Sequence, residues 1–405
     1  MSPPRTLLFT ANSPGEIAGW LRPLVREARR RWPETRIAVI LLPCTFASGS
    51  EGRVAQDLVG VDEVVPASRY LDLLLRGGAR YQPATLVHLG GDLMYAAFLA
   101  WRWRMPAWAY LWGRWWWDSA FQGYFVKDER GVAWLERRRI PTRKARIVGD
   151  LVADAVEAAL EGQPPAPPGP GRKVSFLPGS RAREVEALTP FYLEVAERLA
   201  ATRADLEFQM LLSPFIPPDL AERLLQAPPA PKVGGVPGRL EDGILTSPAG
   251  VRMRIVRTGN QAALAGSELA ITIPGTKTAE AGCLGVPQLV IVPMNRPELV
   301  PFGGLLGLLD WVPGGEHLKG RFLLRLKEKV GLLAQPNLLA GRALLPELVG
   351  VLTPEQVATQ AGSMLDAPEE LRLQSSLLRD LYGPSRGAAE RIFARMEDRT
   401  CPTSP

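Results

Sequence analysis

The 405-residue sequence predicts an α/β protein made of two doubly wound units, each a parallel sheet wrapped by helices. Short apolar runs alternate with segments of helical periodicity, which is typical of strand–helix–strand units. A proline-rich stretch, QPPAPPGPG at residues 163–171, interrupts this pattern and is typical of a stiff linker. Because the same alternation begins again after it, we expect two units of similar construction.

The strands expected in the first half are short apolar runs, at Thr6–Ala11, Ile37–Leu42, Glu63–Val65, Leu86–Leu89, Ala107–Tyr110 and Ile147–Val148. Apolar residues at helical spacing lie between them, at Glu16–Arg31, Leu71–Leu75, Leu93–Trp103 and Lys127–Arg138. This order predicts a parallel sheet, because crossover helices connect parallel strands.

The pattern after the linker predicts strands at Val174–Leu177, Leu206–Leu211, Ile255–Val256, Leu269–Ile273 and Gln288–Val292. The helices expected between them cover Arg181–Ala200, Gln261–Ala265 and Lys277–Leu284. Residues 227–250 are rich in Pro and Gly, which favours a loop or an insertion, and the tail from Pro354 is helical in pattern.

These boundaries predict an N-terminal unit at residues 1–162, a linker at 163–172 and a second unit at 173–353. The helices of residues 354–405 are expected to pack back toward the N-terminal unit. We expect the two units to face each other across a cleft, with ligands at the carboxyl ends of the strands.

The composition is that of an ordinary globular protein, with 46% apolar and 22% charged residues. Two histidines exclude a site built on a histidine cluster. Cys44, Cys283 and Cys401 are too widely spaced to predict a disulfide framework or a metal site. We therefore expect a cytoplasmic protein that needs no metal or other cofactor.

The net charge of +6 is unevenly distributed along the chain. Residues 1–160 hold 22 Lys and Arg against 16 Asp and Glu, whereas residues 161–405 hold 26 of each. Seven of the eleven tryptophans lie in the segment Leu99–Trp117, where arginines interrupt them. Tryptophan interleaved with arginine suits a membrane–water interface, but a core helix and strand with arginines at their rims is the alternative. No signal peptide or run of about 18 apolar residues is present, so no spanning helix is expected.

Two loops at strand ends carry candidate site residues in the first half. Gly15 and Glu16 open the helix after the first strand, where a glycine lets backbone approach a ligand and Glu16 complements the helix dipole. Asp92 follows Gly90 and Gly91 and is well placed as a general base for a sugar hydroxyl. Plain helix capping explains either carboxylate as well.

The second half has two strand-to-helix turns suited to phosphate. Gly179, Ser180 and Arg181 lead into one helix, whose free N–H groups and arginine favour a diphosphate. The other turn carries Gly275, Thr276, Lys277 and Thr278, with Glu280 placed to accept the hydroxyls of a ribose. A capped helix with an exposed glutamate is the alternative for this second turn, and its glycine–lysine spacing is not that of a P-loop.

Four segments together resemble the lipid-A-disaccharide synthase family, inverting glycosyltransferases with two Rossmann-like domains in the GT-B fold. They are LPGSRAREVEALTPFYLEVAERL (177–199), ALAGSELAITIPGTKTAEAGCLGVPQLV (263–290), PNLLAGRALLPELV (336–349) and, more loosely, NSPGEIAG (12–19). The resemblance covers most of the chain. It departs at Gly90–Gly91, where the family has a proline before its carboxylate, at Glu16, where it has aspartate, and at Lys277, where it has a small residue.

The resemblance implies a role for each matching residue. Asp92 falls on the family's essential carboxylate and Glu16 is the second candidate base. On the donor side the resemblance implies contacts to UDP from Ser180, Arg181, Thr276, Thr278, Glu280 and Asn337. From the two turns themselves we expect Gly179, Gly275 and Lys277 to complete the UDP site. On the acceptor and lipid side we expect Gly15, from the glycine turn, and Trp112, Trp115 and Trp116, from the tryptophan-rich segment.

The function expected is transfer of a sugar, an acylated glucosamine, from a UDP-sugar to a lipid-linked sugar acceptor. The expected location is the inner face of the cytoplasmic membrane, with peripheral contact to anionic lipid; oligomers are compatible with the sequence, and nucleic-acid binding is not expected. Two alternatives are a UDP-sugar epimerase or hydrolase of the same fold, and a UDP-sugar- or lipid-binding protein without catalysis.

Overall fold

The structure, a computed structural model, describes residues 4–43, 48–161, 163, 171–230, 233–295 and 331–398. The chain divides into two compact units, residues 1–158 with 384–405 and residues 159–383. The Pro-rich residues 164–170 and Cys44 lie outside the described residues.

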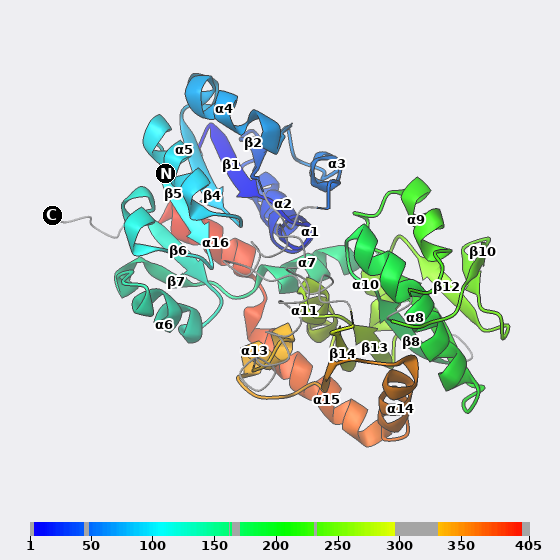
Figure 1. Cartoon of the computed structure of the whole chain (residues 1–405). Helices are drawn as coiled ribbons and strands as arrows, with labels where there is room; N and C mark the ends of the chain where they lie inside the picture. Colours follow the sequence, from blue (N-terminus) through cyan, green and yellow to red (C-terminus); the bar gives the residue numbers. More distant parts are fainter. Residues whose placement is uncertain are drawn as a thin grey trace. The chain divides into compact units, whose positions relative to one another are not determined.

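The sheet of the first unit has seven strands, all parallel, in the order β3-β2-β1-β4-β5-β6-β7 (Figure 1). The strands are β1 (Thr6–Ala11), β2 (Arg36–Leu41), β3 (Glu63–Val65), β4 (Ala84–His88), β5 (Ala107–Tyr110), β6 (Gly123–Val126) and β7 (Ala145–Ile147). The strand order changes direction between β1 and β4, which is the switch point where open α/β sheets bind ligands.

Helices cover both faces of this sheet. They are α1 (Pro14–Glu16), the π-helical η1 (Ile17–Leu21), α2 (Arg22–Arg31), α3 (Glu51–Gln56), α4 (Tyr70–Arg76), α5 (Leu93–Trp103), the 3₁₀ helix η4 (Trp115–Ala120), α6 (Glu129–Arg137), α7 (Leu151–Leu160) and α16 (Ala388–Glu397). One core forms where α5 packs on β1 and β4 through Leu8, Leu86, Ala96 and Ala97, all fully buried.

The second unit has an eight-stranded sheet in the order β10-β11-β12-β9-β8-β13-β14-β15. The strands are β8 (Arg172–Leu177), β9 (Leu206–Leu211), β10 (Arg239–Glu241), β11 (Ile244–Thr246), β12 (Arg252–Val256), β13 (Leu269–Thr272), β14 (Gln288–Pro293) and β15 (Glu347–Gly350). Only the β10–β11–β12 edge is antiparallel. The switch point here lies between β8 and β13.

Helices again flank the sheet in the second unit. They are α8 (Ala182–Ala200), α9 (Pro218–Leu225), α10 (Asn260–Ala265), α11 (Thr276–Cys283), α13 (Gln335–Ala340), α14 (Pro354–Leu365) and α15 (Pro368–Tyr382). The main core packs α8 and α14 on the strands through apolar residues such as Phe176, Leu188 and Val357.

Most of the strands and helices expected from the alternating pattern are present, with shifted ends. The sequence patterns missed β6, β15 and the β10–β11 hairpin inside the expected loop at 227–250. The hairpin turns at Asp242–Gly243, a sequence typical of two-residue β-turns.

One expectation about the C-terminus is corrected. Of the helices in residues 354–398, α14 and α15 belong to the second unit, and only the segment from Pro384, with α16, joins the first. The reason is apolar burial: Val357 and Leu371 enter the core of the second unit, whereas Phe393 packs edge-to-face on Trp32 at 5.0 Å.

Among the described residues no helix has both the length and the apolar character to cross a bilayer. The longest apolar helix in the tryptophan-rich segment, α5, has only 11 residues.

Asp154 of α7 attaches α16 to the first unit. Its two carboxylate oxygens accept the backbone N–H of Gly387 at 2.6 Å and of Ala389 at 2.7 Å, at the start of α16. The substitution Asp154→Ala leaves these two N–H groups without a partner. We expect it to lower the free energy of unfolding by about 1–2 kcal/mol, as for the loss of a strong helix cap.

Urea unfolding followed by tryptophan fluorescence measures this effect, because ten of the eleven tryptophans lie in residues 1–158. The matched control is Glu157→Ala in the same helix, where an exposed ion pair with Arg386 is lost and a change below about 0.5 kcal/mol is expected. Equal effects of the two substitutions would contradict a capping role for Asp154.

Candidate functional site

The switch point of the first unit brings together the loops that follow β1 and β4. The two strands are paired so that Thr10 lies opposite His88, which places residues 12–16 beside residues 90–92. Carboxyl ends of parallel strands at a switch point leave backbone groups and loop side chains free to meet a ligand. Glu16 and Asp92, the two carboxylates predicted from the sequence, both lie here.

The side chain of Glu16 accepts hydrogen bonds from the backbone of the turn that follows β1. Its Oε2 accepts the backbone N–H of Asn12 at 2.7 Å and of Ser13 at 3.2 Å. Gly90 packs directly on this carboxylate, and a Cβ at position 90 would overlap it. Burial raises the pKa of Glu16 to about 7, because the hydrogen bonds from Asn12 and Ser13 offset only part of the cost of removing charge from water. A carboxyl that titrates near neutral pH suits general acid–base catalysis.

The helix that carries Glu16 is irregular at this point. Directly after Glu16, one π-helical turn runs from Ile17 to Leu21 before regular α-helix resumes at Arg22. Single π turns inside helices occur frequently at functional sites.

Asp92 has a different environment. It is exposed, it caps α5, and its Oδ1 accepts the backbone N–H of Met94 at 2.8 Å. Capping, the alternative weighed from the sequence, is therefore present. A catalytic role for Asp92 stays a prediction. Gly15 lies half-buried next to Glu16 inside α1.

The first phosphate turn of the second unit is already occupied by a side chain of the protein. Glu184 is buried, and its Oε2 accepts the backbone N–H of Ser180 at 2.8 Å and of Arg181 at 3.0 Å. Its Oε1 accepts a hydrogen bond from the Arg181 guanidinium at 2.6 Å. Gly179 has φ +107°, and a side chain there would overlap the Glu184 carboxylate. The groups expected to bind a diphosphate are thus engaged by Glu184, so the structure does not support this turn as an open anion site.

The turn before α11 is open. Gly275 has φ +152° and ψ −168°, a conformation that favours glycine, and a Cβ there would meet no atom within 4 Å. Thr276 and Lys277, both half-buried, follow it at the start of the helix. Thr278 has a structural role, because its hydroxyl donates to the Gly275 carbonyl at 2.8 Å and accepts from the Gln335 N–H at 3.2 Å.

Glu280 is paired and buried, which excludes the exposed glutamate considered from the sequence. The Lys277 ammonium lies 2.9 Å from both of its carboxylate oxygens, and Gln261 donates to Oε2 at 3.2 Å. A ligand hydroxyl reaches this carboxylate only by replacing one of these partners.

Asn337 has a structural role at the turn before β15. It is fully buried, and its Oδ1 accepts the backbone N–H groups of Leu344 and Leu345 at 2.7 and 2.8 Å. Its Nδ2 donates to the Leu345 carbonyl and to Glu347. All its hydrogen-bonding groups are used, so the expected contact to a nucleotide requires rearrangement.

Aromatic side chains are exposed on the first unit. Trp112, Trp115 and Trp116, the tryptophans predicted for the lipid side, are 44%, 55% and 51% exposed, and Trp101 and Phe98 of α5 are 42% and 37% exposed. We call these five residues the aromatic surface. Within it Trp115 and Trp116 meet edge-to-face at 5.6 Å, and Phe98 contacts Trp101 at 6.2 Å. Trp103, by contrast, is buried and stacks on Tyr81, so the segment is divided between surface and core.

Arginines accompany these rings. The Arg114 guanidinium lies 5.8 Å from the ring centre of Trp116, and that of Arg138 lies 3.5 Å from Trp134, which contacts Trp112. Such stacked arginines combine positive charge with an apolar platform.

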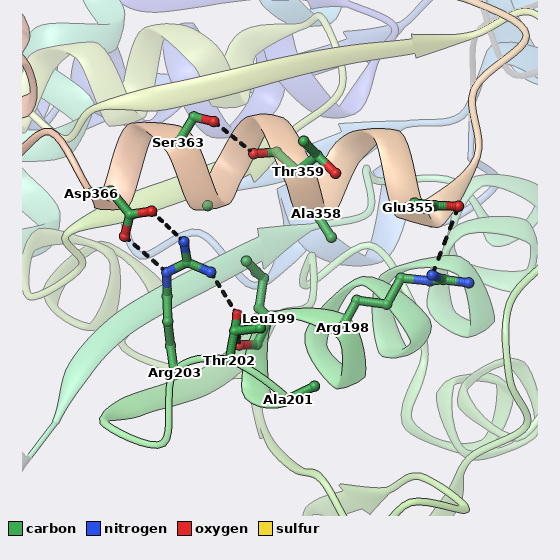
Figure 2. A pocket seen from close by; sticks show the side chains of 11 residues that line it. Arg198, Leu199, Ala201, Thr202, Arg203, Glu355, Ala358, Thr359, Ser363 and Asp366 are labelled. Atoms are coloured by element: carbon green, nitrogen blue, oxygen red, sulfur yellow. Dashed lines mark hydrogen bonds and ion pairs between the residues drawn. The ribbon is translucent and has the colours of Figure 1, made fainter.

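Two cavities lie away from these residues. One is a pocket of about 470 Å³ between the end of α8 and α14, where Arg198 lies 4.0 Å from Glu355. Figure 2 shows its lining side chains, among them Arg203 bonded to Asp366. The other, about 1140 Å³, lies along β9 and β12 beside α10. None of the predicted site residues lines either cavity, and the first is a helix–helix seam held by ion pairs. The described residues contain no cluster of three metal-ligating side chains.

Sequence reasoning missed three features of these sites. The carboxylate of Glu184 could have been expected, since it lies three residues after the cap residue Arg181, the spacing of a capping box. The contact of Gly90 with Glu16 and the pairing of Thr10 with His88 have no signal in the sequence, because they join residues more than 70 positions apart in the chain.

No family model matches the chain. Curated relatives with the name lipid-A-disaccharide synthase do. The protein of Syntrophus aciditrophicus is 27% identical over 223 residues, which cover 54% of this chain and 47% of that protein. That of Myxococcus xanthus is 31% identical over 204 residues, 50% of this chain and 42% of the relative. The protein of Anaeromyxobacter sp. strain K is 26% identical over 286 residues, which cover 64% of this chain and 63% of that protein.

The chain resembles the lipid-A-disaccharide synthases. The resemblance predicted from the sequence motifs is therefore confirmed, although the chain spans about half to under two thirds of the length of these relatives.

Solved structures show the fold. The UDP-GlcNAc 2-epimerase from Neisseria meningitidis bound to UDP-GlcNAc matches with a TM-score of 0.61 and 14% identity, over 97% of this chain and 99% of that one. The UDP-GlcNAc 2-epimerase from Methanocaldococcus jannaschii matches with a TM-score of 0.52 and 13% identity, over 97% of this chain and 99% of that one. At these identities the likeness shows the fold alone, and the predicted α/β class with two sheets of the GT-B type is confirmed.

The raised pKa of Glu16 predicts a specific dependence of stability on pH. A carboxyl whose pKa rises from 4.5 to about 7 on folding binds its proton more tightly in the folded state. Its contribution to stability is complete below about pH 4.5 and is lost as the pH rises through about 7. The free energy of unfolding of the wild type, relative to Glu16→Gln, therefore falls between these values.

Urea unfolding of both proteins from pH 4.5 to 8 measures this difference. Subtracting the variant removes the opposite trend from buried His88, whose pKa is lowered to about 4 by burial. A difference that is constant with pH would show that Glu16 titrates normally.

Proposed function

We propose that the chain is an inverting, metal-independent glycosyltransferase. It moves a sugar, an acylated glucosamine, from a UDP-sugar to a lipid-linked sugar acceptor. The proposal rests first on the half-buried Glu16 carboxylate at the switch point of the first sheet, because transfer needs a base for the acceptor hydroxyl. Similarity to proteins named lipid-A-disaccharide synthase supports the reaction class.

Glu16 is the stronger candidate for the base than Asp92. A base with a pKa near the working pH combines enough ionised form with enough proton affinity, and burial raises the pKa of Glu16 to about 7. Asp92 is exposed and already bonds its own helix. In this assignment Asp92 orders the loop and contributes negative charge near the acceptor.

The donor side is assigned to the turn before α11. Gly275 leaves space for a phosphate, and the start of α11 presents backbone N–H groups and the positive end of its dipole. Lys277 lies at the same turn, where its ammonium is paired with Glu280, and it acts on a phosphate only by exchanging that partner. Glu184 engages the groups of the other turn, so Ser180 and Arg181 act on the donor only if that carboxylate moves.

The proposed step is a single displacement. The acceptor hydroxyl gives its proton to Glu16 while its oxygen bonds to the anomeric carbon, and the bond from that carbon to the UDP oxygen breaks on the opposite face. UDP leaves as an anion whose new charge is stabilised by Lys277 and the α11 N-terminus, which take the part that a metal ion plays in other transferases. The configuration at the anomeric carbon is inverted.

The aromatic surface is assigned to the lipid part of the acceptor and to the membrane. Exposed indole rings and arginines favour the headgroup region of an anionic bilayer. The excess of positive charge in residues 1–160 also favours contact with an anionic bilayer. We therefore propose a cytoplasmic protein in peripheral contact with the inner face of the membrane.

A UDP-sugar epimerase or hydrolase is the second candidate. It is favoured by the fold match to UDP-GlcNAc 2-epimerases over nearly the whole chain. Such an enzyme has no use for an exposed aromatic surface, and it consumes its UDP-sugar without lipid. A UDP-sugar- or lipid-binding protein without catalysis would bind donor and release no UDP.

Transfer is tested with UDP-sugars and a total lipid extract, with UDP release and new glycolipid read by mass spectrometry. We expect UDP release that depends on lipid. Glu16→Gln should lower the rate by about 10²–10⁴-fold, the usual contribution of a general base. Asp92→Asn, the matched loss of one carboxylate at the same sheet edge, should lower it far less.

The outcomes separate the candidates. A large loss in Asp92→Asn with near-normal Glu16→Gln would reverse the two roles. UDP release without any need for lipid would reject transfer in favour of hydrolysis or epimerisation.

Membrane contact is tested by sedimentation with vesicles. We expect binding to phosphatidylglycerol vesicles at low salt and little binding to phosphatidylcholine vesicles. Binding to phosphatidylglycerol should be weaker at 0.5 M NaCl, because the electrostatic screening length shortens to about 3–5 Å. Replacing Trp112, Trp115 and Trp116 together by alanine should lower the binding constant about tenfold or more, since each ring loses apolar burial.

The control variant is Leu71→Ala with Leu75→Ala, which removes exposed apolar side chains of α4, 68% and 65% exposed, from outside the aromatic surface. It should bind as the wild type does. Absence of binding to anionic vesicles at low salt would contradict the proposed contact.

A further inference from the structure

His88 is a buried histidine that the proposed step does not use. It ends β4 and lies directly opposite Thr10 in β1, and its Nδ1 is 2.8 Å from the Thr10 hydroxyl. It has no exposed surface, and the centre of the Phe121 ring lies 6.5 Å from that of the imidazole. A polar pair between two central strands is unusual where apolar contacts fill the core, and it calls for a reason.

The position of the Thr10–His88 pair in the two strands explains why a polar pair lies here. Two residues beyond Thr10 is Asn12, whose N–H holds the Glu16 carboxylate, and two residues beyond His88 is Gly90, which packs on the same carboxylate. The Thr10–His88 contact is thus the last side-chain bond across the two strands before both loops begin.

The two loops also interlock. Gly91 has φ +89°, and a Cβ there would lie 2.6 Å from Asn12 Nδ2, while a Cβ at Gly90 would overlap Glu16. Neither glycine has a side chain with which to hold its own loop in place. The imidazole of His88 acts on this same loop, because the backbone of Gly91 is among the groups that affect its pKa.

We propose that His88 is a positioning residue for Glu16: through Thr10 it fixes the end of β4, and so keeps the Gly90–Gly91 turn closed over the Glu16 carboxylate. It touches neither substrate nor the transferred proton. The proposal assigns the Thr10–His88 pair to keeping water away from the base, and it rests on the function proposed above, in which Glu16 is that base.

The charges around the pair are consistent with this role. Burial lowers the pKa of His88 to about 4, against the effects of the Gly91 backbone and Asp92, so the ring is neutral where Glu16 titrates. Besides its own loop, Glu16 faces Glu51 of α3, whose charge raises its pKa slightly. Loss of a neutral ring therefore changes the titration of Glu16 only by changing its position or its contact with water.

Titration of the Glu16 carboxyl carbon by NMR tests the proposal, with Glu16→Gln identifying the signal. In the wild type we expect a midpoint near the raised value of about 7. Thr10→Val keeps the side-chain shape, His88→Phe puts a larger apolar ring in place of the imidazole, and each substitution removes the polar pair. In both variants we expect the midpoint to fall by about one unit or more toward the ordinary value of about 4.3, as water enters an opened turn.

Two further variants sharpen the result. His88→Asn places an acceptor oxygen near the position of Nδ1 and should restore part of the shift. Thr6→Val is the matched control, because Thr6 is a buried threonine of the same strand at its opposite end, and it should leave the midpoint unchanged. Thermal unfolding shows whether each variant folds. If His88→Phe does not fold, the midpoint measured in Thr10→Val decides the test.

The titration needs no turnover, so it is independent of the transfer assay. A wild-type midpoint near 4.3, or a midpoint near 7 that persists in folded Thr10→Val and His88→Phe, would overturn the proposal. If the midpoint shifts as expected but no lipid-dependent UDP release is found, the proposed function fails and the positioning role stands. Where transfer is measured, the acid limb of kcat/KM should move with the NMR midpoint.

Discussion

Each unit depends on the same local constraint, the unpaired backbone N–H groups where its first strand turns into a helix. In both units a glutamate three residues after the helix cap supplies the acceptor: Glu16 bonds the turn after β1, and Glu184 bonds the turn after β8. A buried N–H group without a partner is costly, so each glutamate stabilises the loop on which its switch point is built.

One residue makes the two turns chemically different. The cap residue is Ser13 in the first unit and Arg181 in the second. Arg181 neutralises Glu184, which becomes a structural ion pair, whereas no Lys or Arg among the described residues bonds Glu16. The uncompensated carboxylate lies under Gly90 and has a raised pKa, which makes the first turn suited to proton transfer and leaves the turn before α11 as the open anion site of the second unit.

The sequence patterns predicted a large part of this arrangement. Apolar alternation located most strands, and the residues that follow them, Glu16, Asp92 and Gly275 among them, do lie at strand ends of the two switch points. The patterns did not separate capping from ligand binding, because both use the same residues at the same spacing. Asn337 and Thr278 illustrate this. Each lies in a segment that resembles the family, and the side chain of each hydrogen-bonds to the backbone of a nearby turn.

The sequence by itself determined the parallel part of both sheets, because periodicity is a local property and strand–helix alternation admits few topologies. It also determined the aromatic and basic content of the first unit. Only the tertiary structure decided that Glu16 is half-buried and Asp92 exposed, which turn is already filled and which tryptophans are exposed. The reason is physical: the pKa of Glu16 is set by Gly90 and by the β1–β4 pairing, contacts between residues far apart in the chain that no local pattern encodes.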